Sequence, residues 1–341
     1  MPPFPMPTAG PFPLIDSIGF TCAAAETAAA FFCRELGFVA EAEALVLEPG
    51  PYAALVGLAG ARLKLVRLRL GRERLELWEV LDPGPGARPG RPVPADSRSC
   101  DLWFQHICVV VNTMEAAAAG VRRRIGSGEL GAISSAPQCL PAWNRAAAGI
   151  EAFKFRDPDG HPIELLHFPP DKGDPRWHRP QVAPQVAPQL GSPFLGLDHS
   201  AIAVADTART ARFYGDLLGF RPAGDGVNSG PEQDRLDGLT DTRVRITAHR
   251  AAEGMGLEAL QYLPPNGGRP MPADLGFQDL AHVQVRVVVA ALEGVAGRVV
   301  GFGGTVLSAG PVELAEPWLA ARWALQIADP DGHRLQIVAA A

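Results

Sequence analysis

The chain lacks most features of secreted, membrane-spanning and nucleic-acid-binding proteins. Its 341 residues contain only five cysteines and no Cys-x-x-Cys pair, which disfavours a disulfide framework and favours reduced thiols. The apolar runs are as short as strands and never approach the roughly 20 residues that a membrane-spanning helix needs. There is no block of Lys or Arg and the net charge is −6, so we expect neither a nucleic-acid nor a membrane partner.

Signals for export and for phosphate or nucleotide binding are missing as well. The opening MPPFPMPTAGPFP has no basic segment and is broken by prolines, unlike a signal peptide. No nucleophile elbow, Walker loop or dinucleotide fingerprint occurs. With 47% hydrophobic residues the chain can fill cores, and its length predicts two domains. We therefore expect a cytoplasmic protein, monomer or homodimer, that binds a small molecule.

What the chain does contain is an internal repeat. The segment LIDSIGFTCAAAETAAAFFCRELGF (14–38) aligns without a gap with GLDHSAIAVADTARTARFYGDLLGF (196–220), at an offset of 182 residues. The same offset places Glu76 of LELWEVLDP on Glu258 of LEALQYLPP. A repeat of this length indicates duplicated supersecondary units.

A second pair of segments repeats at a different offset. FKFRDPDGHPIELL (153–166) matches LQIADPDGHRLQIV (325–338) at 172 residues, and each follows a strand-like segment that contains a histidine. Four modules therefore follow one another in the order A–B–A′–B′. The Pro-rich PQVAPQVAPQLGSP separates the halves and is typical of an extended linker. We predict a tail over 1–13, domains over 14–170 and 196–341, and a linker over 171–195.

Each module is expected to form a strand, a helix and three further strands. In the third module a helix over about 206–218 ends at Gly219. In the B modules Asp-Pro-Asp-Gly predicts the tight turn between the last two strands. Strand alternation puts the more β-branched face of each first strand under the helix, so that the opposite face, with the histidine, lines the inside of the sheet.

Histidine and carboxylate recur at matching points of these modules. His106, His199 and His282 occupy the first strands, where the first module has Ser17. The final strands contain Glu76, Glu164 and Glu258, with Gln336 in the last module. A lone strand histidine or glutamate says little, but their recurrence supplies imidazole and carboxylate together. Such mixed sets bind Zn, Ni, Mn or Fe(II).

These motifs resemble the vicinal oxygen chelate superfamily, which includes glyoxalase I, extradiol dioxygenases and the bleomycin resistance proteins. The shared features are the FYxDxLGF helices, the DPDGHxxEL hairpins and the histidine of the first strand, over roughly 14–168 and 196–339. The resemblance implies an α+β fold in which four βαβββ modules form two paired-module, cup-shaped open sheets with helices on the convex side. It also implies that metal ligands come from the first and last strands of two modules.

Carried over by position, the resemblance gives each half of the chain one ligand set. The second half offers His199, Glu258, His282 and Gln336, and the first half offers Ser17, Glu76, His106 and Glu164. We favour the second half, because two histidines and a carboxylate leave coordination positions open for substrate. Two sites, or the first-half site alone with its Glu76, His106 and Glu164, remain alternatives.

The chemistry implied by the resemblance has three versions. We expect a metal-dependent lyase or isomerase of glyoxalase type that acts on a small molecule with vicinal oxygens, with Glu258 as catalytic base. An extradiol dioxygenase using Fe(II) or Mn(II) is the first alternative, although Gln336 replaces the expected Glu. A non-catalytic drug-binding protein of the bleomycin resistance type is the second, with Trp143, Trp318 and Trp323 as candidate lining residues.

Overall fold

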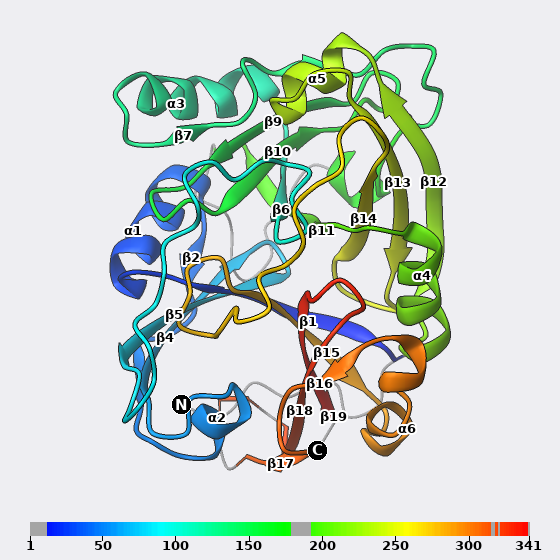
Figure 1. Cartoon of the computed structure of the whole chain (residues 1–341). Helices are drawn as coiled ribbons and strands as arrows, with labels where there is room; N and C mark the ends of the chain where they lie inside the picture. The colour runs from blue at the N-terminus through cyan, green and yellow to red at the C-terminus, as the bar shows by residue number, and fades with distance from the viewer. Residues whose placement is uncertain (1–11, 179–191, 315–317, 320, 340–341) are drawn as a thin grey trace.

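The computed structural model describes residues 12–178, 192–314, 318–319 and 321–339, which form two open, mixed β-sheets flanked by few helices. Sheet 1 has the strand order β16-β18-β19-β15-β1-β5-β4-β2, with β17 beside β18 and β3 beside β4. Sheet 2 has the order β12-β13-β14-β11-β6-β10-β9-β7, with β8 beside β9. Figure 1 shows sheet 2 in the upper part of the molecule and most of sheet 1 below it. The α+β class with two open sheets is confirmed.

The strands of sheet 1 are β1 (Leu14–Thr21), β2 (Val39–Ala40), β3 (Leu45–Leu47), β4 (Arg62–Leu70), β5 (Glu73–Asp82), β15 (Val283–Val289), β16 (Thr305–Val306), β17 (Val312–Glu313), β18 (Trp323–Ala328) and β19 (Arg334–Ala339). Those of sheet 2 are β6 (Gln105–Val111), β7 (Gly131–Ala132), β8 (Gln138–Cys139), β9 (Glu151–Arg156), β10 (Pro162–His167), β11 (Phe194–Ala203), β12 (Arg221–Ser229), β13 (Arg243–Arg250) and β14 (Gly256–Tyr262).

Each sheet combines modules from opposite halves of the chain. The central antiparallel pair of sheet 1 joins β1 of the first module to β15 of the fourth, and that of sheet 2 joins β6 of the second to β11 of the third. The expectation that each half forms its own paired-module unit is therefore wrong. The predicted boundaries at 14–170 and 196–341 remain a division of the sequence, and most of the predicted linker lies outside the described residues.

The internal repeat is visible in the strand register. In sheet 1 Ser17 pairs with Arg74 and Gly19 with Glu76, between parallel strands β1 and β5. In sheet 2 the residues 182 positions later, His199 with Gly256 and Ala201 with Glu258, pair in the same way between β11 and β14. The first and third modules thus share both sequence pattern and hydrogen-bond register.

Helices α1, α3, α6 and η2 pack on the β-branched faces of the strands, as expected, whereas α2 and α5 lie on the opposite faces. The bounds of the helices are α1 (Ala25–Leu36), α2 (Pro51–Leu55), α3 (Met114–Gly126), η1 (Pro175–His178), α4 (Thr207–Ala211), η2 (Arg212–Leu217), α5 (Pro231–Asp237), α6 (Glu293–Ala296) and η3 (Val300–Phe302). The predicted helix over about 206–218 is α4 continued by the π-helical η2. Ile107 and Val109 of β6 and Val285 and Val287 of β15 share one buried core with α1, α3 and η2.

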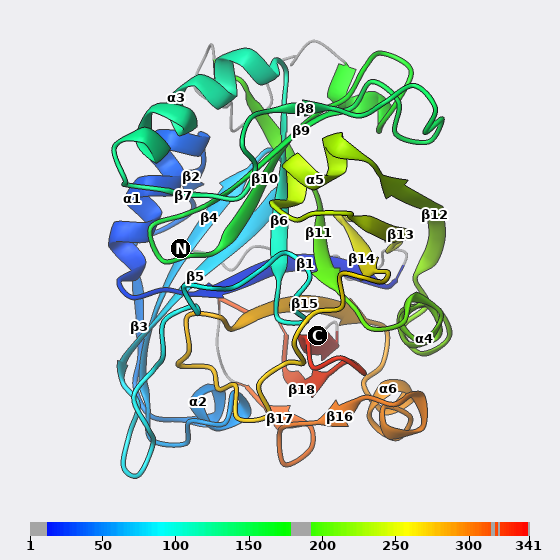
Figure 2. The same cartoon turned by 45° about the horizontal axis from the view of Figure 1, so that its top comes forward.

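Four of the helices, α1, α3, α4 and α6, lie at two flanks of the sheets. α1 and α3 lie beside each other, joined by an ion pair between Glu35 and Arg124 at 2.6 Å, while α4 and α6 occupy the opposite flank (Figures 1 and 2). In the described part of the chain no helix is long and apolar enough to cross a membrane. The strand faces turned away from the shared core are the concave faces, and they contain the candidate ligands.

Candidate functional site

The concave face of sheet 2 brings together two histidines and two glutamates. His106 lies on β6, Glu164 on β10, His199 on β11 and Glu258 on β14. These are four adjacent strands, in the order β14-β11-β6-β10, so their side chains converge from both sides of the central pair. We call these four residues the His/Glu cluster.

Each half of the chain was predicted to supply one ligand set, and the structure splits both sets between the two sheets. His199 and Glu258 join the His/Glu cluster, whereas Gln336 lies on β19 of sheet 1 and His282 directly precedes β15 of the same sheet. The expectation that these four residues surround one ion does not hold. Likewise, from the first-half set, His106 and Glu164 belong to sheet 2 and Ser17 and Glu76 to sheet 1. Each predicted set is divided because each sheet is built from one module of the first half and one module of the second half.

Strand register also shows that His282 is not the counterpart of His106. Glu164 pairs with Cys108 in sheet 2, and Gln336 pairs with Arg286 in sheet 1, so Arg286 corresponds to Cys108. Two residues earlier on each strand, His106 then corresponds to Gln284. The sequence comparison placed His282 two residues out of register, because both segments contain a histidine but a loop of different length precedes the final hairpin.

The ligand atoms of the His/Glu cluster are close together. Oε2 of Glu164 lies 3.3 Å from Nε2 of His106 and 3.7 Å from Nε2 of His199. Oε2 of Glu258 lies 3.4 Å from Nε2 of His199. His106, Glu164 and His199 are buried, while the Glu258 side chain is 26% exposed and so reaches toward solvent. The cluster therefore has a closed end and one open side.

A buried carboxylate orients His199. Oδ2 of Asp198 lies 3.0 Å from Nδ1 of His199, and the guanidinium of Arg250 donates to the same oxygen at 2.7 Å. Because Nδ1 is engaged with a carboxylate, Nε2 is the ring nitrogen that faces Glu164 and Glu258. A carboxylate behind a histidine ligand is the usual way in which proteins fix the tautomer of a metal-bound imidazole.

Lys154 lies behind Glu164. Its buried ammonium donates to Oδ1 of Asp237 at 2.7 Å and lies 3.8 Å from Oε1 of Glu164. Burial tends to raise the pKa of Glu164, but the charge of Lys154 and the neighbouring imidazoles outweigh it and lower that pKa to about 2. Glu164 is therefore ionised at neutral pH.

The other members of the cluster differ in how they hold protons. Burial lowers the pKa of His106 to about 4, against the opposing effect of Glu164, so that imidazole is neutral at pH 7. Burial raises the pKa of Glu258, and the charge of Glu164 adds to this effect. One neutral imidazole, one ionised carboxylate and one carboxylate with a raised pKa thus lie within a few ångströms of one another.

The corresponding position in sheet 1 is closed by an arginine. The guanidinium of Arg286 donates to Ser17 Oγ at 3.1 Å, to Gln336 Oε1 at 2.8 Å and to both carboxylate oxygens of Glu76, at 2.7 Å for Oε2. All four residues are buried. A fixed positive charge among the groups that correspond to the cluster is incompatible with a cation there. Sheet 1 therefore offers no second copy of the site.

Sequence reasoning missed three residues that shape these sites: Asp198, Lys154 and Arg286. Each has a signal in the sequence. An Arg within the apolar run VQVRVVV and a Lys within AFKFR are charges on strands predicted to be buried, where unpaired charge is rarely tolerated. Asp198 recurs at the 182-residue offset as Asp16. Of the candidate lining residues, Trp143 and Trp323 are 59% and 40% exposed, and Trp318 packs against Tyr52 of α2 and Trp78 of β5.

Comparison with known proteins agrees with this fold. Residues 199–338 match the family model of a glyoxalase-like domain. The crystal structure of glyoxalase I from Zea mays superposes with a TM-score of 0.58 at 15% identity, covering 96% of this chain and 92% of that one. A putative dioxygenase from Bacillus subtilis superposes with a TM-score of 0.53 at 14% identity, covering 97% and 86% of the respective chains. No curated protein sequence matches the chain.

Each of the two open sheets has a central pair of antiparallel strands, and each strand of that pair is parallel to its outer neighbour. This arrangement is the fold class of the glyoxalase-like proteins. The chain has this glyoxalase-like fold, with two halves that each contribute to both sheets, and its residues 199–338 match a glyoxalase-like domain. These findings support the resemblance seen in the motifs and confirm the fold that it implies.

Proposed function

We propose that the chain is a metal-dependent enzyme of glyoxalase-like lyase or isomerase type, acting at the His/Glu cluster on a small molecule with vicinal oxygens. The observation that carries this proposal is the charge of the cluster. Arg250 and Lys154 are bound to Asp198 and Asp237, respectively, so that Glu164 and Glu258 have no Lys or Arg cation at hydrogen-bond distance among the described residues.

The unsatisfied atoms of the cluster fit a divalent cation. Nε2 of His106 and Nε2 of His199 are buried and have no hydrogen-bond partner among the described residues. Buried polar atoms without partners are costly, and a cation bound by two imidazoles and carboxylates removes that cost. His106, Glu164 and His199 offer ligand atoms within 4.8 Å of one another, with Glu258 alongside. The donor set suits Zn, Ni, Mn or Fe.

The residues of the cluster have different roles in the proposed reaction. When bound, a divalent cation polarises substrate oxygens and acidifies the adjacent C–H bond. His106, His199 and Glu164 hold the cation, and Asp198 keeps His199 in the required tautomer. Glu258 is the partly exposed member and has a raised pKa, which suits a general base that takes up and returns a proton.

The second carboxylate places this reaction ahead of the alternatives. A ring-cleaving dioxygenase of the Fe(II) type needs two histidines and one carboxylate, which leaves Glu258 without a role. A protein that only sequesters a drug has no need for two adjacent carboxylates without a Lys or Arg at hydrogen-bond distance. The likeness to glyoxalase I is one of fold, and it supports the proposal to that extent.

The test uses protein loaded separately with Ni, Zn, Co, Mn or Fe(II). We expect anaerobic isomerisation of a thiol–methylglyoxal adduct, and a loss of at least about 100-fold in kcat for Glu258→Gln with substrate binding retained. Glu313→Gln, at an exposed glutamate of sheet 1, is the control and keeps full activity.

Other results would point elsewhere. Oxygen uptake with a catechol would replace the lyase or isomerase by a dioxygenase. No turnover in either screen, together with no bound metal, would support sequestration instead.

A further inference from the structure

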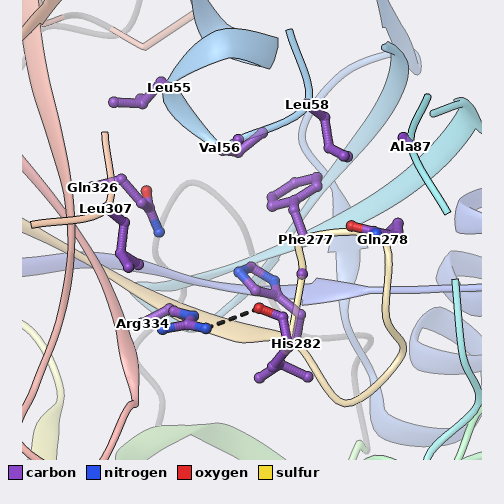
Figure 3. A pocket seen from close by; sticks show the side chains of 13 residues that line it. Leu55, Val56, Leu58, Ala87, Phe277, Gln278, His282, Leu307, Gln326 and Arg334 are labelled. Atoms are coloured by element: carbon purple, nitrogen blue, oxygen red, sulfur yellow. Dashed lines mark hydrogen bonds between the residues drawn. The ribbon is translucent and has the colours of Figure 1, made fainter. Parts of the chain in front are cut away.

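A separate cavity of about 340 Å³ lies on the concave face of sheet 1. It is lined by residues of α2 and the segment after it, of the segment before β15, and of β18 and β19 (Figure 3). Its volume is at the lower end of the range for small-molecule sites. None of its lining residues belongs to the His/Glu cluster, which is on sheet 2.

One end of the cavity presents a cation without an acidic partner. Arg334 donates from Nη2 to the carbonyl oxygen of Leu275 at 2.8 Å. Among the described residues no carboxylate forms an ion pair with its guanidinium, and burial lowers the pKa of Arg334 against the opposing charge of Asp329. A half-buried guanidinium with N–H groups to spare is a binding group for a carboxylate, which it can engage through two parallel hydrogen bonds.

Two hydrogen-bond acceptors line the same cavity. Gln326 is buried, donates from Nε2 to Gln284 Oε1 at 3.2 Å, and has no partner for its Oε1 among the described residues. Thr21 Oγ1 donates to the carbonyl of Phe277 at 2.7 Å and lies 3.3 Å from Nδ1 of His282. The hydroxyl proton is thus used, so Nδ1–H of His282 donates to Thr21 and Nε2 is left as an acceptor.

These polar groups lie close to one another. Gln284 pairs directly with Arg334 across β15 and β19, and Gln326 lies on the adjacent strand, opposite Gln336. Alternation puts Arg334, Gln336, Gln284 and Gln326 on one face. Figure 3 shows the His282 imidazole beside the Arg334 guanidinium at the same end of the cavity.

The rest of the cavity wall is apolar and held in place. Leu55, Leu58, Leu307 and Phe277 line it. The segment that contains Phe277 is tied to the segment that contains Ala87, because Arg88 and Arg91 both donate to Asp279, at 3.0 Å for Arg91. The apolar wall is therefore part of a braced structure and not a loose flap.

We propose that this cavity binds a small carboxylic acid with a hydrogen-bond donor on the carbon next to the carboxylate and an apolar chain beyond it. Arg334 takes the carboxylate, and the apolar chain lies on Leu55, Leu58 and Phe277. Gln326 Oε1 and His282 Nε2 are the acceptors for the donor, a hydroxyl donating to one of them and an ammonium to both. A 2-hydroxy acid and a 2-amino acid share this chemistry. The site does not depend on the metal of the His/Glu cluster.

The test is calorimetric titration of the chelator-treated, metal-free full chain with four probes of one carbon skeleton. They are 2-hydroxy-4-methylpentanoate, leucine, 4-methylpentanoate and 2-hydroxy-4-methylpentanamide. We expect one molecule of the hydroxy acid or of leucine to bind per chain, at least about tenfold more tightly than 4-methylpentanoate, and no binding of the amide. The tighter of the first two identifies the donor as hydroxyl or ammonium.

Variants locate the binding. Arg334→Gln weakens binding at least about tenfold, and Leu307→Trp, which fills the cavity from a half-exposed position, abolishes it. Arg322→Gln, at an exposed arginine near the same sheet, and Glu164→Gln in the cluster leave it unchanged. Thermal unfolding confirms that each variant is folded. Equal binding of the acid and the amide, unchanged binding by Arg334→Gln, or binding of none of the probes would overturn the proposal.

Discussion

His106 and His199 place their Nε2 atoms 3.3 Å and 3.7 Å from the same oxygen, Oε2 of Glu164, although the two histidines come from opposite halves of the chain. Their rings lie 5.9 Å apart, between centroids, across the antiparallel pair of β6 and β11. The candidate site therefore exists only where the second and third modules meet. Neither half of the sequence contains it alone.

The first prediction concerns the two halves as separate chains. Residues 1–178 and 192–341 expressed singly are expected to give no folded monomer, because the central strand pair of each sheet needs one strand from each half. Co-expressed, they should purify as a 1:1 complex. Light scattering and circular dichroism check this, and a stable folded monomer of either half would contradict the topology.

The second prediction concerns Lys154. Replacing it by Met leaves Asp237 buried without its ion-pair partner, which should lower the free energy of unfolding of the metal-free protein by about 3 kcal/mol. The same change removes a positive charge 3.8 Å from Glu164, so the cluster should bind Zn more tightly. Urea unfolding and competition with a chelator measure the two effects. Lys64→Met, on sheet 1, is the control and should leave the affinity for Zn unchanged.

The third prediction concerns an ion pair between the sheets. Glu73 of β5 is buried, accepts from Arg176 at 2.6 Å and accepts from the backbone N–H of Leu197 on β11 at 3.2 Å. Arg176→Met leaves this carboxylate unpaired and should cost about 3 kcal/mol in urea unfolding. Arg245→Met breaks an exposed pair with Asp225 and should have no measurable effect. Equal losses in both variants would refute the assigned role of Glu73.

The fourth prediction concerns acid sensitivity. Burial, aided by the charge of Arg334, lowers the pKa of His282 from its ordinary 6.5 to about 3. Between these values the unfolded chain holds a proton that the folded chain does not, so stability falls as pH drops below about 6.5. His282→Gln should reduce that slope by up to about 1.4 kcal/mol per pH unit. Urea unfolding of the metal-free protein at pH 7, 6 and 5 checks this, and parallel curves for both proteins would be inconsistent with a buried neutral His282.

The repeats and the strand alternation in the sequence predicted the four modules, but they do not determine which modules pair in one sheet. The register of β1 with β5 and of β11 with β14 follows the 182-residue offset, and the β-branched faces of β6 and β15 pack on the helices as alternation requires. Which strands meet at the centre of a sheet depends on long-range packing, and equivalent modules offer similar edges to more than one partner.

The same limit explains why the candidate residues were grouped into the wrong sets. His106, Glu164, His199 and Glu258 were all identified as candidates from recurrence alone, but they were assigned to two different sites. His282 is the histidine of its segment, but the strand register makes Gln284 the counterpart of His106. Arg286 shows the missing physical argument: a buried arginine needs buried acceptors, and Ser17, Glu76 and Gln336 are those acceptors.

The most direct test of the account is the metal content of the purified full chain after saturation with Zn and removal of the excess. We predict one ion per chain for the wild type and for His282→Ala, and less than about a tenth of that for His106→Ala and for His199→Ala, because only the latter two remove ligands of the cluster. Retention of the ion by both His106→Ala and His199→Ala, or its loss from His282→Ala alone, would contradict the assignment of the site to the junction of the two halves.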